Sequence, residues 1–242
     1  MPNVVESRWL LNLYPGAGEA GGCLQTATRP DGDREPFERA EERSTIEAVR
    51  RARRQVRLYC ADNRLTRLGT LTYAGAGCHD PVQFRRHVAA FFRKLRAAVG
   101  EPFPYLWVPE WHPGGHGLHC HFVVGQYVHW RTIKAAWGRG RIDIRMLNDL
   151  PVGSGALGES RLAARYLSKY LGKDLGTTGT GGLHRYEVAQ HFAPKVRRLT
   201  GATLDEVLDR AVAIMGAEPS ILWDSTSQPD WDGPHAVWAS WA

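Results

Sequence analysis

The sequence of 242 residues lacks any apolar run long enough to cross a membrane, because charged residues and glycines interrupt every hydrophobic segment. It also lacks the apolar run after a basic start that is typical of a secretory leader. We therefore expect a soluble, cytoplasmic protein without a membrane partner. Its length suits one main domain that can bury a core of its own.

Cysteine is scarce, and the four cysteines include no CxxC pair. Structural zinc sites of the Cys-rich kind are built on such pairs, so the sequence argues against one. Cys120 falls in a strand-like segment whose pattern would bury it. We expect reduced thiols, as in a cytosolic protein.

Lysine is also scarce, at five of the 31 basic residues, so arginine carries most of the positive charge. The formal net charge of +6 is matched by one segment, residues 50–67, which holds seven arginines and one aspartate. A solvated helix face is one interpretation of this run, and a binding surface for a polyanion is the other. Because the guanidinium fork suits phosphate, we predict nucleic-acid contacts. The predicted contact residues are Arg50, Arg51, Arg53, Arg54 and Arg57.

Cap, turn and periodicity signals predict an α+β fold with a central antiparallel sheet of about five strands, covered on one face by helices. Helices are expected at 44–63, 81–99, 130–137, 159–173 and 204–215. Strands are expected at 67–73, 105–110, 118–125, 141–146 and 183–192.

Composition divides the chain into three parts. Residues 1–40 are rich in Gly, Pro, Asp and Glu and show no sustained period, which predicts a loose N-terminal arm. Residues 41–198 form the main domain. Residues 199–242 are expected to be a helix and a Trp-rich tail packed on that domain, since indoles in a polar tail usually pack rather than stack on bases.

Two histidines, His119 and His121, flank Cys120 in a strand-like segment. Side chains alternate across a strand, so both imidazoles project from one face while Cys120 joins the apolar residues of the other. Antiparallel pairing with Glu110 opposite His119 would bring a carboxylate to the same face. We predict a site for Mg²⁺ or Mn²⁺ on these three ligands, which leave coordination positions open for phosphate oxygens. Alternatives for the third ligand lie in the turn between the strands: His112 and His116.

Two tyrosines, Tyr166 and Tyr170, stand one helical turn apart. At 100° per residue they share an arc of roughly 100° with Lys169 and Lys173. The apolar residues gather on the opposite side, so the tyrosines are not the core face of this helix. A phenol has a pKa of about 10 and needs cations to attack at neutral pH, a role open to the two lysines.

Together these motifs resemble the HUH (His-hydrophobic-His) endonucleases, specifically the two-tyrosine rolling-circle replication initiators (Rep proteins). Thr70-Leu71-Thr72 is similar to the first family motif and His119-Cys120-His121 to the metal motif. The segments 166–169 and 170–173 are similar to two overlapping copies of the Tyr-x-x-Lys motif. Histidines before tyrosines is the order in Rep proteins and tyrosine transposases, and the reverse of conjugative relaxases. Residues 48–198 also resemble initiators of actinobacterial plasmids and phages.

The resemblance implies that the sheet carries the metal and that the tyrosine helix lies across it. It implies sequence-specific nicking of single-stranded DNA at a replication origin or origin hairpin, through a 5′-phosphotyrosyl intermediate with a free 3′-OH. Two tyrosines would permit two successive strand transfers. The sequence has no G-x-x-x-x-G-K-[ST] phosphate loop, so a host helicase and polymerase are the expected partners.

Three other interpretations remain open. A tyrosine transposase would share every site residue. A DNA-binding regulator of the same fold would have lost the chemistry. A small-molecule metallohydrolase would use His119, His121 and Glu110, but would leave the tyrosine helix and the arginine run unexplained.

Overall fold

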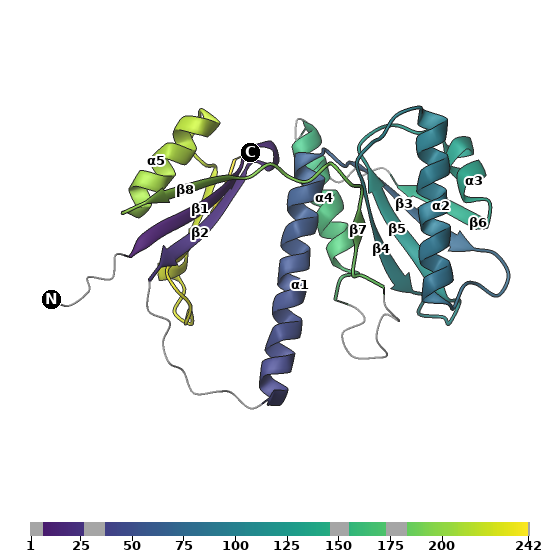
Figure 1. The fold of residues 1–242 in the computed structure, drawn as a ribbon, viewed down its shortest axis with the longest axis horizontal. Coiled ribbons are helices and arrows are strands. Elements are labelled where there is room, and N and C mark those ends of the chain that lie inside the picture. The colour runs from purple at the N-terminus through teal and green to yellow at the C-terminus, as the bar shows by residue number, and fades with distance from the viewer. Residues whose placement is uncertain (1–6, 27–36, 146–154, 173–182, 242) are drawn as a thin grey trace. The chain divides into compact units, whose positions relative to one another are not determined.

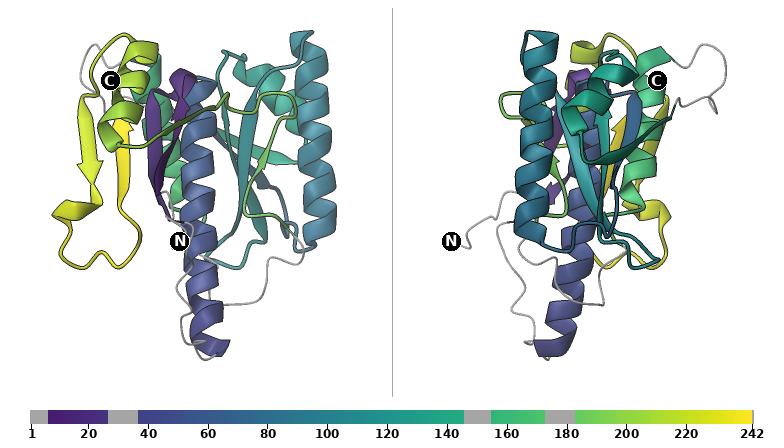
Figure 2. Two further views of the ribbon diagram at one scale, coloured as in Figure 1. Left: turned by 60° about the vertical axis from the view of Figure 1, so that its left-hand side comes forward. Right: turned by 90° about the vertical axis from the view of Figure 1, so that its right-hand side faces the viewer.

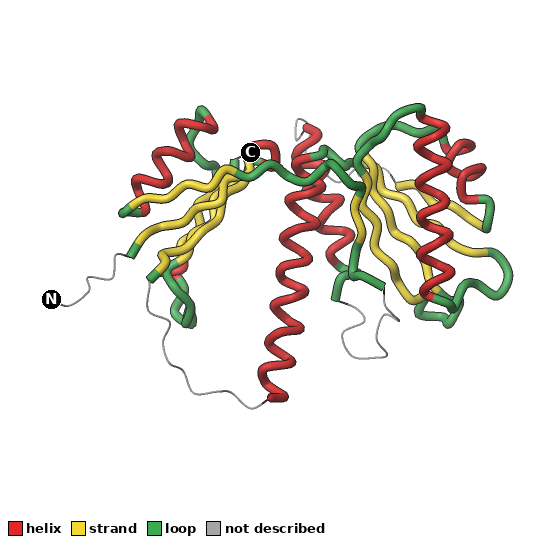
Figure 3. Tube along the Cα trace, viewed as in Figure 1, coloured by secondary structure: helices red, strands yellow, loops and turns green. Residues whose placement is uncertain are grey.

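The structure is a computed structural model that describes residues 7–26, 37–145, 155–172 and 183–241 (Figure 1). The chain divides into two compact units. We call Glu41–Ala193 the central unit, and Met1–Ala40 together with Pro194–Ala242 the terminal unit. Each unit contains a five-stranded antiparallel sheet, so the protein is α+β, as predicted (Figure 3). No helix in the described ranges is both long and apolar enough to span a membrane.

The sheet of the central unit has the strand order β6-β3-β5-β4-β7. Its strands are β3 (Arg67–Tyr73), β4 (Tyr105–Trp111), β5 (Leu118–Val124), β6 (Gly140–Arg145) and β7 (Glu187–Val188). Strands β4 and β5 form the predicted hairpin, and the register places Glu110 opposite His119. The edge strands of this sheet are β6 and β7.

Helices lie on both faces of this sheet, whereas the sequence pattern predicted them on one. Helices α1 (Phe37–Asp62) and α4 (Gly155–Ser168) pack on one face, and α2 (Pro81–Val99) and α3 (Trp130–Trp137) on the other (Figures 1 and 2). The reason is visible in β5, where Val123 is buried in one core and Phe122 and Val124 in the other. Since both faces of the strand carry apolar side chains, both need a helical cover.

Local signals explain the boundaries of α2. The carboxylate of Asp80 accepts a hydrogen bond of 2.8 Å from the backbone amide of Val82, and Pro81 occupies the first helical position. Gly100 ends the helix in the left-handed conformation, at φ 90°. Helix α1 begins at Phe37, before the predicted start at residue 44.

The terminal unit corrects the prediction of a loose arm. Residues 8–25 form a hairpin of β1 (Arg8–Tyr14) and β2 (Glu19–Gln25). The rest of the unit comes from the other end of the chain: β8 (Arg197–Gly201), α5 (Leu204–Met215), β9 (Ile221–Asp224) and β10 (Ala236–Ser240), with the short 3₁₀ turns Pro15–Ala17 and Ser225–Ser227.

The strand order in this unit is β8-β1-β2-β10-β9. The alternation of Trp9, Leu11 and Leu13 is a strand signal, and these side chains pack in one core with Val207 and Ala211 of α5. Residues 197–198, which were predicted to belong to the main domain, lie in β8. The predicted Trp-rich tail contains two strands of this sheet.

Candidate active site

The predicted metal ligands lie on the face of the central sheet that α1 and α4 cover. Alternation along β5 directs His119 and His121 to this face, while Cys120 is fully buried in the opposite core. Glu110, on the neighbouring strand, reaches His121: its Oε2 lies 2.6 Å from the Nε2 of that imidazole. The structure therefore brings one predicted carboxylate into direct contact with one predicted imidazole.

The other ring nitrogen of His121 is held by β3. Thr70 pairs opposite His121 in the sheet, and its Oγ1 lies 3.1 Å from His121 Nδ1. A hydrogen bond at the second nitrogen fixes the orientation of an imidazole, which is how metal-binding histidines are usually supported. Thr70 belongs to the first motif noted in the sequence, and the structure gives it a contact.

The other predicted imidazole, His119, differs from His121. Its Nε2 is buried and has no hydrogen-bond partner within the described part of the chain. Burial, followed by the proximity of His112 and His121, lowers the pKa of His119 to about 4. The ring is therefore neutral at pH 7, and its unpartnered Nε2 can bind a metal in the tautomer that carries the proton on Nδ1. The ring centroid of His112 is 4.6 Å from that of His119, so the turn histidine remains an alternative ligand.

These observations test whether a divalent cation suits the site. A neutral imidazole with an unpartnered nitrogen, a second imidazole oriented by a hydroxyl and an adjacent carboxylate form a donor set suited to such an ion. In the described ranges, no three His, Cys, Asp or Glu side chains already converge on one point. The donor chemistry fits, and Glu110 and the histidines would have to turn toward a common centre.

The tyrosine segment lies directly on the histidines. The ring of Tyr170 stacks on that of His121, with centroids 3.9 Å apart and planes inclined by 11°. Its hydroxyl donates a hydrogen bond of 3.0 Å to the hydroxyl of Tyr166. Leu167 and Leu171 are buried, as predicted, and anchor the segment. The prediction that the tyrosines avoid the core is wrong, because Tyr166 and Tyr170 are partly buried and pack against the same core cluster as the leucines.

The helix is shorter at this end than predicted. Helix α4 ends at Ser168, and the amides of Lys169 and Tyr170 bond to the carbonyls three residues earlier, in tight turns. This tightening accompanies the stacking of the Tyr170 ring on His121. The predicted residue Lys173 lies outside the described residues.

Burial raises the pKa of Tyr170 well above its ordinary value, and the hydrogen bond and charge of Tyr166 and the charge of Glu110 raise it further. Arg145 acts in the opposite direction. The Tyr170 phenol is therefore protonated at neutral pH. A proton acceptor or a nearby positive charge is needed before it can act as a nucleophile.

Two cations flank Tyr166. The Nζ of Lys169 lies 5.3 Å, and the guanidinium carbon of Arg145 5.9 Å, from the centroid of its ring. The electrostatic interaction with Tyr166, followed by the hydrogen bond to Asp143, raises the pKa of Arg145. Arg145 was not among the predicted site residues. Its signal in the sequence was the alternation Arg141, Asp143, Arg145, along what proves to be an edge strand next to Thr70.

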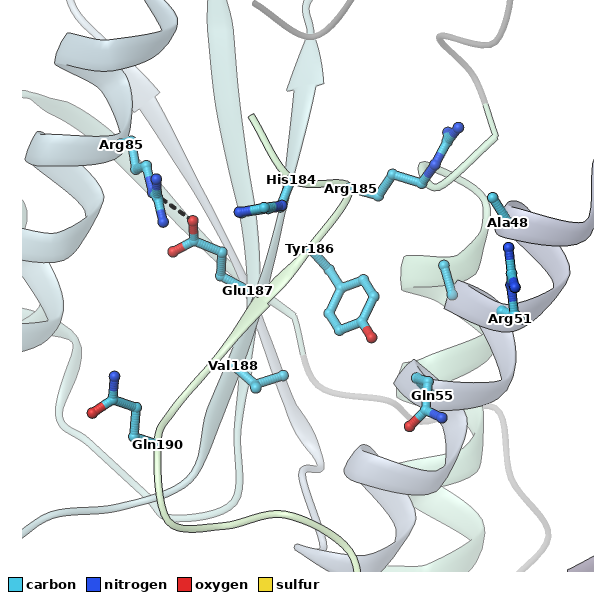
Figure 4. A pocket seen from close by; sticks show the side chains of 11 residues that line it. Ala48, Arg51, Gln55, Arg85, His184, Arg185, Tyr186, Glu187, Val188 and Gln190 are labelled. Carbon is cyan, nitrogen blue, oxygen red and sulfur yellow. Dashed lines mark ion pairs between the residues drawn. The ribbon is translucent and has the colours of Figure 1, made fainter. Parts of the chain in front are cut away.

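The predicted DNA-binding arginines all belong to α1. Four are exposed and Arg57 is partly buried. Arg51 lines a cleft of about 610 Å³ between α1 and the segment of β7, together with His184 and Arg185 (Figure 4). Arg185 also donates a hydrogen bond of 3.3 Å to the carbonyl of Leu171, next to Tyr170. Arg185 therefore connects the lining of the cleft with the segment that carries Tyr170. DNA contact by the arginines of α1 stays a prediction.

Comparison with known proteins gives one match. Residues 66–175 match the family described as replication-associated protein ORF2/G2P. No curated protein and no solved structure matches the chain. The matched segment runs from the start of β3 past the tyrosine turn, so it contains Thr70, both histidines and both tyrosines. Over this segment the chain is similar to replication-associated proteins, which supports a Rep-type protein that acts in the initiation of DNA replication.

Proposed function

We propose that this protein is an HUH endonuclease of the two-tyrosine Rep type, which nicks single-stranded DNA at an origin and starts rolling-circle replication. The observation that carries the proposal is the stacking of Tyr170 on His121, with Tyr166 in hydrogen-bond contact. It brings two phenols, the proposed nucleophiles, beside the imidazole and carboxylate that are proposed to bind the metal. A metallohydrolase of small molecules would not require this juxtaposition.

In the proposed reaction, His119, His121 and Glu110 would hold a divalent cation. When bound, such an ion would polarise the scissile phosphate and neutralise charge in the transition state. Thr70 keeps the His121 ring in position for this task. Arg145 and Lys169 are placed to stabilise a phenolate at Tyr166.

The chemical step is a transesterification. A tyrosine oxygen bonds to phosphorus while the bond from phosphorus to the 3′ oxygen breaks. The phenol loses a proton and the released 3′ oxygen gains one. The product is a 5′-phosphotyrosyl adduct and a free 3′-OH, on which a host polymerase could extend behind a host helicase. The hydrogen bond between the tyrosine hydroxyls would let the second phenol take part in a later transfer.

The test is the formation of the covalent adduct. Full-length protein is incubated with a pool of single-stranded oligonucleotides and Mn²⁺ or Mg²⁺, and adducts are isolated under denaturing conditions and sequenced. We expect a DNA–protein adduct attached at Tyr166 or Tyr170, and none in the Tyr166→Phe, Tyr170→Phe double variant. An adduct that persists in the double variant would contradict the nucleophile assignment. DNA binding without any adduct would favour a regulator that has lost the chemistry.

A further inference from the structure

A second cavity lies on the opposite face of the central sheet from the candidate active site. It is formed by α3, the edge strand β6 and the residues between β5 and α3, and its volume is about 270 Å³. Phe122, Val124 and Ile133 provide an apolar floor. Small-molecule pockets typically measure about 300–1,000 Å³, so this one suits a single compact group.

Large apolar side chains are exposed around the cavity. Tyr127 is 67 % exposed, Trp130 49 % and Ile144 39 %. Single exposed aromatic residues are ordinary, but three large side chains around one apolar cavity indicate a binding surface. Tyrosine and tryptophan in such positions are the platforms on which unpaired bases stack.

The charges around the cavity are positive. Arg67 lies 5.3 Å from the Tyr127 ring centroid, and Arg131 and Lys134 lie 5.5 and 6.0 Å from that of Trp130. The lining residues include no aspartate or glutamate. The rim therefore favours an aromatic group that carries negative charge nearby.

The Nε of Arg67 and the Nε2 of Gln126 are buried and unpartnered in the described part of the chain. Both atoms are closed to solvent, so a ligand would reach them only after a side-chain rotation, and its acceptor atoms would then offset the cost of the unpaired donors. An aromatic ring with acceptor atoms, attached to a phosphate chain, matches the aromatic rim, the positive charges and the two donors of this cavity.

The cavity is also close to the tyrosines around one edge of the sheet. Ile144 lines the cavity, while its neighbour Arg145 lies over the ring of Tyr166. Successive residues of a strand point to opposite faces, and β6 is an edge strand. A single nucleic-acid strand that passes over this edge could reach both places.

We propose that the cavity binds one unpaired base of the DNA strand that is cut at the tyrosines. Because its volume of about 270 Å³ suits a compact group, it accepts a pyrimidine such as thymine in preference to the larger purine adenine. The identity of the strand rests on the proposed function. The cavity itself rests on its aromatic rim, its positive charge and its two unpartnered donors.

The experiment measures binding without cleavage. Full-length protein in EDTA is titrated with oligothymidylate, oligoadenylate and a fully abasic strand of the same length, and affinity is read from fluorescence anisotropy. We expect oligothymidylate to bind most tightly. Trp130→Ala should weaken its binding about tenfold, as expected for the loss of a stacked base, and leave the abasic strand unaffected. Tyr127→Ser, at a more exposed position, should act in the same direction.

Trp231 provides a matched control, because it is 45 % exposed and lies in the terminal unit. Trp231→Ala should bind all three strands like wild type. Equal weakening of the thymidylate and abasic strands by both cavity variants would overturn the proposal, as would unchanged thymidylate binding. Oligoadenylate that binds as tightly as oligothymidylate would refute the preference for a pyrimidine.

A parallel adduct assay with Mn²⁺ separates this proposal from the proposed function. Base-dependent binding through Trp130 without any adduct would contradict the nicking reaction alone. An adduct without base-dependent binding would contradict the cavity alone.

Discussion

The two faces of the central sheet are built by the same strands but carry different kinds of side chain. Along β5, His119 and His121 face α4 and the tyrosines, whereas Cys120 and Phe122 are buried against α2 and α3. One face holds polar side chains, among them an imidazole nitrogen that has no hydrogen-bond partner in the described ranges and a phenol of raised pKa. The other is mainly an aromatic core, with the cavity proposed to bind a base beside the edge strand β6. Residues that are adjacent in the sequence should therefore have separable effects, on activity for one face and on stability for the other.

The largest expected effect is on the apolar face. Phe122 is 2 % exposed and packs against Phe91 and Phe92. Phe122→Ala should lower the free energy of unfolding by about 3–5 kcal/mol, because it removes buried surface and leaves a cavity. Urea denaturation followed by circular dichroism measures this decrease. A change below about 1 kcal/mol would mean that the site collapses easily and that the two faces differ less than proposed.

The next effect is on the polar face. His121→Ala should reduce cleavage of single-stranded DNA at least about 100-fold. Even residues that only hydrogen-bond to a metal ligand contribute about 10- to 100-fold to metal affinity or activity. Binding of the same strand in EDTA should largely persist. The neighbouring Cys120→Ala is the control and should retain cleavage. If DNA binding falls as far as cleavage in His121→Ala, the histidine is structural and the division between the faces fails.

A smaller effect is expected at Thr70. Thr70→Val removes the oxygen that lies 3.1 Å from His121 Nδ1 and keeps the shape of the side chain. We expect a 10- to 100-fold rise in the Mn²⁺ concentration needed for half-maximal cleavage, roughly the contribution of such supporting hydrogen bonds. Thr72→Val, on the same strand and face, serves as the control. An unchanged metal requirement in Thr70→Val would show that the ring needs no such support.

The smallest expected effect is on the salt dependence of DNA binding, and it compares the helices that cover the two faces. Arg50 and Arg53 are exposed on α1, and Arg86 and Arg93 are exposed on α2. Arg50→Gln with Arg53→Gln should lower the slope of log affinity against log salt by about 0.7 for each phosphate of a single strand that these arginines neutralise. The corresponding α2 pair should leave the slope unchanged. Equal slopes for the two double variants would exclude a special role for α1.

Several features of the central unit were predictable because they depend on local periodicity. The register of Glu110 with His119 followed from two strands joined by a short turn. The burial of Leu167 and Leu171 followed from their spacing in the sequence. Arg145 was not predicted at the site, because its position beside Tyr166 depends on the pairing of β6 with β3 and on where α4 packs.

The terminal unit was not predictable for a related reason. The prediction of a loose arm missed the alternation of Trp9, Leu11 and Leu13, and one of the two partners of this strand, β8, lies at residues 197–201. No local pattern states which distant segment completes a sheet. The loose arm was predicted from the Gly, Pro, Asp and Glu content of residues 1–40 instead.

The sequence alone determined which residue types could perform the chemistry and which of them share a face, because side-chain direction follows from the periods of strand and helix. Only the tertiary structure decided that the Tyr170 ring lies on His121, that Arg145 joins the tyrosines and that the two ends of the chain form one sheet. These interactions join residues far apart in the chain. They arise from the burial of apolar surface over the whole fold, which a local pattern does not encode.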